Sequence, residues 1–447
     1  MNTLAGTPIT FTVFGATGDL FARKIIPSLY FLYTRKKIPE SFSVIGFGRH
    51  PHTTESFREY VFINLKRVQS DCTVRSSKGF LELFHYHRGE FHDVDSFTEL
   101  KKRFEHNDML RGSLSLKSFY LAVPPELVRT LVPHIASVAP KGSTHRNILI
   151  EKPFGKNEET ARALNAFLDE YFDESEIFRI DHYLAKPVLQ KLLHARRDHH
   201  LYETLRLTER IKEVTVTLFE EMGVEKRGAF YDGVGALRDV GQNHHLEMLA
   251  LSLMEIPDFT PRAVCSARES FIASLPKLTD GHIIENTTRA QYETYQSIPG
   301  VAQDSRVETY FDIRFALTHA PHKGVPVRLR GGKRMSQIKK DVVIEFDCDH
   351  TDSLHIELEP VPRIYTKKGS LITTIEEYKD EEPKIQYADE YAQLFLDSWH
   401  SDHTRFPTKK EVELEWIFAD PILETWEQGE PALKTYIPGG ALPWETD

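Results

Sequence analysis

Side chains that could bind an anion and move a proton lie together in the run from Arg179 to Lys186 (RIDHYLAK). Arginine and lysine are cations, histidine and tyrosine donate hydrogen bonds, and an aspartate can orient a neighbouring imidazole. A phosphate clamp beside a general base needs this combination. A charged helix start with a solvated face would use the same residue types, so other parts of the chain must decide between the two interpretations.

Ahead of this run, the sequence predicts a nucleotide-binding unit. Residues 9–14 form a short β-rich run, and a pattern of helix formers extends to about Lys37. The turn between them consists of Gly15, Ala16, Thr17, Gly18, Asp19 and Leu20. Glycines let the backbone approach a pyrophosphate, which the N–H groups of the following helix start can hold. A plain turn is the alternative interpretation.

A second strand is predicted at residues 43–48, and Arg49 follows it where an NAD-binding protein usually has an acidic residue. An acid at this position accepts from the ribose 2′-OH, whereas an arginine pairs with a 2′-phosphate. The sequence therefore favours NADP over NAD. A solvated loop cation is the alternative role of Arg49.

Further strands are expected to place polar residues at the same sheet edge. Residues 52–115 are charged and predicted to be helical, residues 116–123 form a buried strand closed by Pro124, and residues 147–151 form another strand that ends at Lys152. Open α/β sheets bind ligands at the carboxyl ends of their strands. Asn157 is predicted to begin a helix over residues 158–172.

The second half of the chain has a different pattern. Residues 213–219, 311–315, 342–346 and 355–358 alternate apolar and polar side chains, as half-buried antiparallel strands do. We expect an α+β domain in which one sheet face packs on helices and the other is solvated or forms a dimer interface. His244 precedes a leucine-rich helical pattern and is predicted to lie in the first turns of that helix.

Composition excludes several classes of protein. The chain has 447 residues, enough for two or three domains, and a net charge of −10 with a pI near 6.1, which argues against a duplex nucleic-acid binder. Three scattered cysteines suggest no disulfide framework. No secretory signal and no apolar run of membrane-spanning length is visible, so a cytoplasmic location and no membrane partner are expected. The histidines have no metal-site spacing, and no metal is expected.

Taken together, these residues resemble the glucose-6-phosphate dehydrogenase family. The matching stretches follow the family order: Gly15 to Leu20, Leu121 to Pro125, Glu151 to Gly155, Arg179 to Lys186, Arg238 to His244, Gly324 to Lys333, and Asp420 to Trp426. The resemblance implies a Rossmann-type NADP-binding α/β domain over residues 1–178. It also implies a larger α+β domain with a broad, mostly antiparallel sheet over residues 179–447, which binds substrate and mediates assembly into a homodimer or homotetramer.

The resemblance implies oxidation of C1 of a sugar phosphate by NADP, with His244 as the base and Asp181 as its orienting carboxylate. It implies these substrate-binding residues: Lys152, His182, Tyr183, Lys186, Glu220, Asp239 and Lys333. It implies these cofactor-binding residues: Gly15, Ala16, Thr17, Gly18, Asp19, Leu20, Arg49, Pro124 and Lys152. Each of Glu220, Asp239 and Lys333 has an alternative role as a salt-bridged charge, and His245 is expected to be structural.

Four positions depart from the family pattern. Ala185 and Ala290 replace glycines, Pro187 replaces a glutamate, and Ile338 stands where the family has a basic residue, although Lys339 and Lys340 follow it. These departures keep a dehydrogenase of another hexose phosphate or of a free sugar open as an alternative. A silent NADP-binding regulatory protein is a third possibility.

Overall fold

The computed structural model describes residues 7–140, 145–198, 210–347, 351–377 and 388–444. The chain forms two compact units that are interleaved in sequence. Unit 1 consists of Met1–Phe154, Arg162–Ala185 and Asp380–Lys409, and unit 2 consists of Gly155–Ala161, Lys186–Lys379 and Lys410–Asp447. The domain boundary between residues 178 and 179 stays a prediction.

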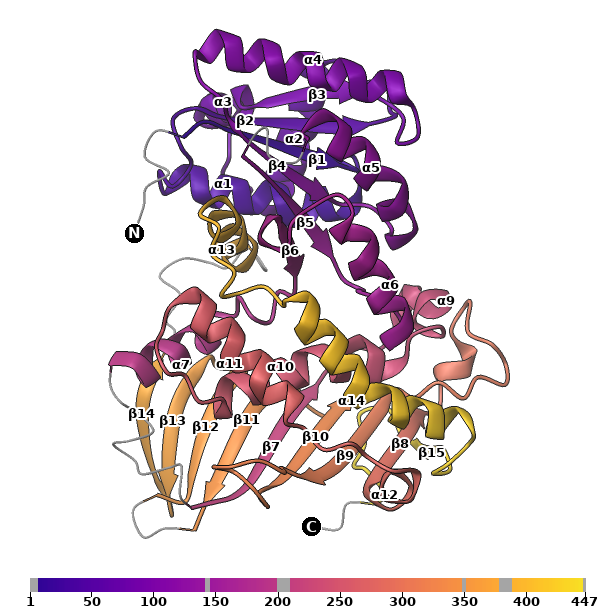
Figure 1. Cartoon of the computed structure of the whole chain (residues 1–447). Helices are drawn as coiled ribbons and strands as arrows, with labels where there is room; N and C mark the ends of the chain where they lie inside the picture. The colour runs from indigo at the N-terminus through magenta and orange to yellow at the C-terminus, as the bar shows by residue number, and fades with distance from the viewer. Residues whose placement is uncertain (1–6, 141–144, 199–209, 348–350, 378–387, 445–447) are drawn as a thin grey trace. The chain divides into compact units, whose positions relative to one another are not determined.

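Unit 1 contains a six-stranded parallel sheet with the order β3-β2-β1-β4-β5-β6 (Figure 1). Its strands are β1 (Ile9–Phe14), β2 (Phe42–Gly48), β3 (Phe84–Arg88), β4 (Leu116–Leu121), β5 (Arg146–Glu151) and β6 (Ile177–Ile180). This is the order of a Rossmann-type fold, and it reverses direction between β1 and β4. Such a switch point leaves a crevice at the carboxyl ends of the strands, where dinucleotides bind.

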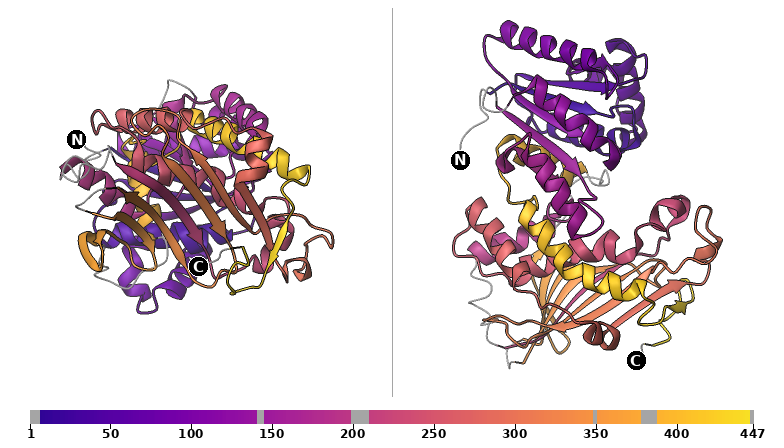
Figure 2. Two further views of the ribbon diagram at one scale, coloured as in Figure 1. Left: turned by 90° about the horizontal axis from the view of Figure 1, so that it is seen from below. Right: turned by 45° about the vertical axis from the view of Figure 1, so that its right-hand side comes forward.

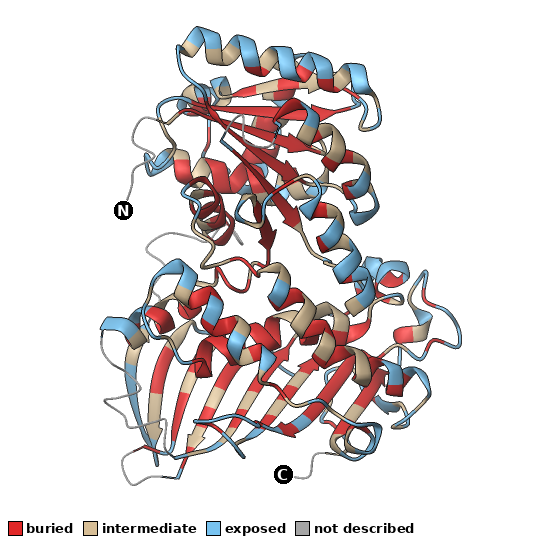
Figure 3. Cartoon of the chain, viewed as in Figure 1, coloured by how far each residue is buried: buried red, intermediate tan, exposed pale blue. Residues whose placement is uncertain are grey.

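Helices cover both faces of this sheet, and the central strands are buried throughout (Figure 3). The helices of unit 1 are η1 (Phe21–Ile25), α1 (Ile26–Thr34), α2 (Thr54–Val68), α3 (Val74–Glu82), α4 (Val94–Arg111), η2 (Pro125–Leu127), α5 (Val128–Val138), η3 (Glu174–Glu176) and α13 (Ala388–Trp399). Helix α13 comes from near the end of the sequence, and its Phe395 ring lies 5.2 Å from that of Phe11 on β1. Helix α6 (Glu158–Asp169) includes residues of both units.

Three local predictions need correction. The predicted helical region 52–115 contains a strand, β3, which pairs with β2. The helix after the glycine turn ends at Thr34 rather than near Lys37, because Lys36 has a left-handed φ of 54°. Helix α6 ends at Asp169 rather than at residue 172. The predicted start at Asn157 is confirmed, since its Oδ1 accepts from the Thr160 N–H at 3.0 Å.

Unit 2 contains a nine-stranded sheet with the order β14-β13-β12-β11-β7-β10-β9-β8-β15. Its strands are β7 (Ile211–Phe219), β8 (Thr287–Tyr292), β9 (Tyr310–Ala316), β10 (Pro326–Gly332), β11 (Lys339–Phe346), β12 (Ser353–Glu359), β13 (Arg363–Lys368), β14 (Leu371–Glu377) and β15 (Lys434–Tyr436). Two of the pairings, β7 with β10 and β8 with β15, are parallel, and the others are antiparallel. The predicted fold class, a Rossmann-type domain and a larger domain with a mostly antiparallel sheet, is confirmed.

Helices of unit 2 gather on one face of this sheet, and the views in Figure 2 show no helix over the opposite face in the described part of the chain. They are α7 (Pro187–Asp198), η4 (Glu225–Arg227), α9 (Gly228–Tyr231), η5 (Leu237–His245), α10 (Leu246–Leu253), α11 (Pro261–Ala273), α12 (Asp280–Asn286), η6 (Tyr295–Ser297) and α14 (Lys409–Glu427). None of the helices described for the chain is long and apolar enough to cross a membrane.

Candidate active site

The glycine turn of unit 1 lies between β1 and η1, as the sequence predicts. Gly15 has φ of +85°, and a Cβ there would lie 2.3 Å from the carbonyl oxygen of Ala122. Only glycine therefore fits this position. The Gly18 N–H donates to the Gly15 carbonyl at 2.9 Å and closes the turn ahead of the helix. The turn is therefore compact, and at Gly15 and Gly18 no side chain covers the backbone ahead of the helix start, where a pyrophosphate would bind.

The other predicted cofactor residues follow neighbouring strands of the same parallel sheet. Arg49 follows β2 and is exposed, Pro124 lies just beyond β4, and Lys152 follows β5 directly. Parallel strands end at one edge of a sheet, so these residues lie along the edge that carries the glycine turn. This part of the chain has the donors and the shape that a nicotinamide dinucleotide needs.

A half-buried carboxyl group to which the sequence pattern assigns no role, that of Glu151, lies at the end of β5. Glu151 accepts hydrogen bonds from the hydroxyls of Tyr120 and of Tyr391, the latter at 3.1 Å. Burial raises the pKa of Glu151, although both tyrosine hydrogen bonds act in the opposite direction. Because Glu151 precedes Lys152, this network fixes the backbone that carries the lysine. No local signal links Tyr391 to this position.

The run that begins at Arg179 starts within the buried strand β6 and continues into a turn after that strand ends. Arg179 is buried, and its guanidinium donates to Glu174 at 2.8 Å and to Asn165 at 2.9 Å. It is thus held in the interior by unit 1 and takes no part in a surface phosphate clamp. After β6 ends, the Asp181 carboxylate accepts from the Tyr183 N–H at 2.8 Å, which shapes a tight turn around His182.

Lys186 begins the part of this run that belongs to unit 2. Helix α7 starts at Pro187, the position at which proline is most compatible with a helix, and Lys186 is the residue before it. The Nζ of Lys186 lies 3.9 Å from Oε1 of Glu359 at the end of β12. Pro187 therefore fixes the helix start without turning Lys186 away from other charged groups.

The strand register of unit 2 brings Lys333 beside Glu220. Glu220 follows β7 and Lys333 follows β10, and these parallel strands are in register with Phe219 opposite Gly332. Their carboxyl ends are therefore side by side. The Nζ of Lys333 lies 2.8 Å from Glu220 and 3.1 Å from Asp239 of η5.

Further residues of opposite charge lie beside Glu220 at the same edge of the sheet. Lys340 lies opposite Glu359 in the β11–β12 pair, with its Nζ 3.1 Å from the Glu359 carboxylate and 3.9 Å from Glu220. We call the connected set Lys186, Glu359, Lys340, Glu220, Lys333 and Asp239 the charge ladder. Among the predicted substrate residues, the structure brings together Lys186, Glu220, Asp239 and Lys333, and it adds Lys340 and Glu359.

Lys333 dominates the electrostatics of the ladder. Burial disfavours its charged form, but Asp239 and Glu220 outweigh burial and raise its pKa. Burial likewise acts to raise the pKa of Glu220, yet the charges of Lys333 and Lys340 bring that pKa below its usual value. Both shifts favour the charged forms of Lys333 and Glu220 near neutrality. The ladder offers both donors and acceptors to a polyhydroxylated ligand.

His244 and His245 have different surroundings on η5, a π-helical segment that continues into α10. Each ring nitrogen of His245 lies near a backbone carbonyl oxygen, of Val240 at 3.0 Å and of Arg330 at 2.8 Å, and burial lowers its pKa. His245 is therefore structural, as expected. The Nδ1 of His244 lies 3.9 Å from the buried carboxylate of Glu247. π-Helical segments often occur at functional sites.

The predicted residues are thus divided between the units. Asp181, His182 and Tyr183 belong to unit 1 together with the cofactor residues and Lys152, and His244 and the ladder belong to unit 2. The pairing of Asp181 with His244 therefore stays a prediction.

Comparison with known proteins agrees with this arrangement. The family model described as glucose-6-phosphate dehydrogenase, NAD binding domain, matches residues 12–191, and that of the C-terminal domain matches residues 193–447. Glucose-6-phosphate 1-dehydrogenase of Treponema pallidum is 32% identical over 98% of this chain and 93% of its own length. Glucose-6-phosphate 1-dehydrogenase 2 of Mycobacterium bovis is 31% identical over 94% of this chain and 88% of its own length.

A solved structure of glucose-6-phosphate dehydrogenase in complex with its substrate glucose-6-phosphate superposes with a TM-score of 0.89. It has 27% sequence identity and covers 99% of this chain and 97% of its own. The resemblance inferred from the sequence is confirmed. The chain belongs to the glucose-6-phosphate dehydrogenase family of oxidoreductases, whose N-terminal domain binds a nicotinamide dinucleotide.

Proposed function

We propose that the chain oxidises C1 of glucose 6-phosphate with NADP, giving the 1,5-lactone and NADPH in the pentose-phosphate pathway. The observation that carries this proposal is the pair of ion pairs that Lys333 forms with Glu220 and Asp239 at one end of the unit 2 sheet. Two carboxylates and an ammonium group at this spacing can accept from and donate to adjacent sugar hydroxyls. The family of the chain supports the same activity.

His244 is the general base in this proposal. It removes the proton of the C1 hydroxyl, a task that suits imidazole near neutral pH. A nicotinamide dinucleotide held by unit 1 would supply the acceptor for the hydride that leaves C1. Asp181 orients the imidazole and stabilises its protonated form, and the buried carboxyl group of Glu247 lies 3.9 Å from Nδ1. Lys152 donates to the C1 oxygen and contacts the dinucleotide.

The phosphate group of the substrate is bound at the other end of the ladder, where Lys186 lies. His182 and Tyr183 offer hydrogen-bond donors, and Lys186 offers a point charge. Ile338 lacks the positive charge that the family has at its position, and Lys340 compensates for it. Lys340 lies two residues further on, and side chains two apart along an extended chain point to the same side. Its contact with Glu359 places it beside Lys186.

NADP is the proposed cofactor. Arg49 follows β2 and is exposed, so its guanidinium can pair with the 2′-phosphate that distinguishes NADP from NAD. Gly15 to Leu20, with Pro124 and Lys152, would contact the rest of the dinucleotide. We propose a homodimer or homotetramer formed through the helix-free face of the unit 2 sheet (Figure 2), and a cytoplasmic location.

A substrate panel tests the proposal. Purified protein is assayed for reduced nicotinamide with glucose 6-phosphate, glucose and glucosamine 6-phosphate, each with NADP or NAD. The proposal expects the highest kcat/KM with glucose 6-phosphate and NADP. Faster turnover of another sugar would favour a dehydrogenase of another hexose phosphate or of a free sugar. The departures from the family pattern at Ala185, Pro187 and Ile338 are the reason to test this alternative. NADP binding without any turnover would favour a regulatory protein.

A further inference from the structure

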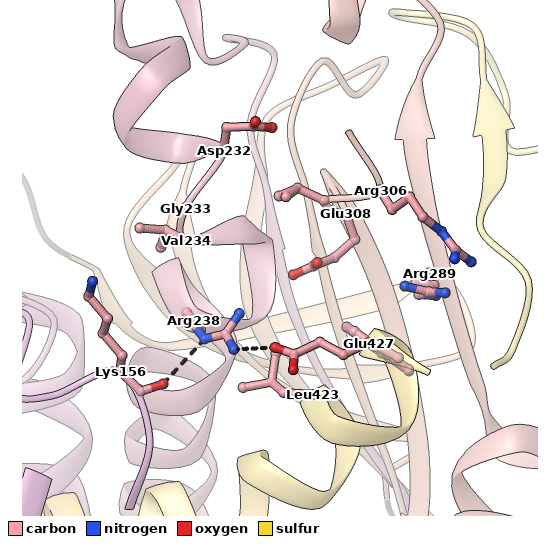
Figure 4. Close-up of a pocket in the computed structure, with 12 residues that line it drawn as sticks. Lys156, Asp232, Gly233, Val234, Arg238, Arg289, Arg306, Glu308, Leu423 and Glu427 are labelled. Carbon is pink, nitrogen blue, oxygen red and sulfur yellow. Dashed lines mark hydrogen bonds and ion pairs between the residues drawn. The ribbon is translucent and has the colours of Figure 1, made fainter. Parts of the chain in front are cut away.

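A cavity of about 400 Å³ lies in unit 2, and charged side chains from five separate segments of the unit line it (Figure 4). Its charged lining includes Lys156, Arg238, Arg289, Arg306, Glu308 and Glu427. Asp232 also lines it, whereas none of the charge-ladder residues does. The cavity is therefore distinct from the proposed sugar site.

Two arginines that line the cavity, Arg289 and Arg306, form no ion pair with a carboxylate of the described residues. Arg289 of β8 is only 3% exposed, and its Nε donates to the Pro431 carbonyl at 2.8 Å. Its buried Nη2 has no hydrogen-bond partner among the described residues. Arg306 is exposed, its guanidinium lies beside that of Arg289 in Figure 4, and it makes no ion pair within the described part of the chain.

Placing two like charges side by side is unfavourable. Burial lowers the pKa of Arg289, and the charge of Arg306 lowers it further. A guanidinium group remains protonated in proteins, so the repulsion persists at neutral pH. An anion bound between the two groups would remove it, and it would also give the buried Nη2 of Arg289 a partner.

The acids that line the cavity already accept hydrogen bonds or form ion pairs with other groups. Asp232 accepts from the Tyr295 hydroxyl at 3.0 Å and from the Ala302 N–H at 3.1 Å. Glu427 pairs with Arg238 at 3.0 Å. Glu308 is buried, and its Oε1 accepts from the Leu237 N–H at 2.8 Å. Glu308 and Glu430 partly offset the effect of Arg306 on the pKa of Arg289, but neither forms an ion pair with it among the described residues.

We propose that this cavity is a second ligand site, which binds a small organic phosphate with its phosphate on Arg289 and Arg306 and a hydroxyl on Glu308. Paired guanidinium groups suit a phosphate because each can donate two parallel hydrogen bonds. The volume exceeds what inorganic phosphate needs, so the ligand carries an organic part that reaches Glu308.

The position of Glu308 links this cavity to η5, the element that carries Asp239 and His244. Its carboxylate accepts from the first residue of η5, and a Cβ on Gly235, which has φ of +76°, would lie 2.5 Å from it. Arg238 is the neighbour of Asp239. A ligand on Glu308 therefore acts on η5 and changes the KM for glucose 6-phosphate. This regulatory step rests on the proposed function, whereas ligand binding does not.

Calorimetric titration with ribose 5-phosphate tests the site. The probe is titrated into the Lys186→Gln variant of the full chain, which weakens phosphate binding at the proposed active site. Binding should remain, and adding Arg306→Gln should weaken it roughly tenfold to a hundredfold, the range for loss of a charge-assisted hydrogen bond. The matched control is Arg314→Gln, an arginine with a 60% exposed side chain on β9, which should leave binding unchanged.

Arg306 is exposed, so its variant should fold, and a thermal melt confirms that it does. Arg289→Lys is the second variant, and it should weaken the same binding event. Unchanged binding in both variants would overturn the proposal, and so would tighter Arg306-dependent binding of citrate than of ribose 5-phosphate. Arg306-dependent binding without any sugar-phosphate turnover would support the site and refute the proposed function. Normal turnover of glucose 6-phosphate without Arg306-dependent binding would support the proposed function and refute the second site.

Discussion

Replacing Lys333 by methionine should destabilise unit 2, because Lys333 stands between two carboxylates. The lysine is buried, and its charged hydrogen bonds to Glu220 and Asp239 are 2.8 and 3.1 Å long. Such bonds contribute about 1.5 to 3 kcal/mol each. The two carboxylate side chains are 32% and 22% exposed, so solvent screens part of this energy. We expect the free energy of unfolding to fall by about 2 to 4 kcal/mol at pH 7.

The loss of unfolding free energy in Lys333→Met should decrease as the pH falls. The folded-state pKa of Glu220 lies below its usual 4.5, since Lys333 and Lys340 overcome the opposing effect of burial. The carboxylate therefore contributes stability that is present above the unfolded value and is lost as pH falls through the folded one. Without Lys333 that contribution disappears. The difference between wild type and variant should be largest near neutrality and should shrink below pH 4.5.

Urea unfolding from pH 8 to pH 4, followed by tryptophan fluorescence and circular dichroism, measures both effects. The two probes are fitted separately, since coincident transitions are the test of two-state unfolding. Lys368→Met is the matched control, since the Lys368 side chain is 45% exposed and pairs with Asp352 at 3.0 Å. It should cost at most about 1 kcal/mol. A loss below about 1 kcal/mol for Lys333→Met at pH 7, or one equally large at pH 4, would refute the reasoning.

Three further outcomes are expected. Burial and nearby arginines lower the pKa of His85 to about 4, below its unfolded value of 6.5, so stability should rise with pH across that window. His85→Gln should flatten this rise in a series of thermal melts, and an unchanged slope would contradict the assignment. Lys340→Met should raise the KM for glucose 6-phosphate roughly tenfold while sparing turnover of free glucose, and equal losses with both sugars would exclude a phosphate contact. Glu247→Gln should lower kcat less than loss of His244 does and should move the acid limb of the pH profile, whereas a profile identical to that of wild type would make Glu247 purely structural.

Local features of the fold were predictable from the sequence. The strand, glycine turn and helix around Gly15 follow from neighbouring residues, and the structure adds the close approach to Ala122 that requires glycine. The alternating runs of the second half were found because their period of two is a local signal. Strand β3 was missed because Phe84–Arg88 is short and lies between strongly helical segments.

Features that depend on distant pairing were not predictable from pattern alone. The contact of Lys333 with Glu220 follows from the parallel register of β7 and β10, which joins residues more than a hundred positions apart. The residue type of Arg179 suggests a phosphate ligand, whereas in the structure its guanidinium pairs with the carboxylate of Glu174. The cavity lined by Arg238, Arg289 and Arg306 has no sequence signature, because its residues come together only in the folded unit.

The rate of NADPH formation from glucose 6-phosphate by wild type and by His244→Asn tests the central claim most directly. We expect rapid turnover by wild type and a loss of roughly 10²- to 10⁴-fold in kcat for the variant, the range for removal of a general base. His245→Asn is the control, and it should keep most activity per folded molecule because both of its ring nitrogens face backbone carbonyls. Equal activity of His244→Asn and wild type would contradict the account.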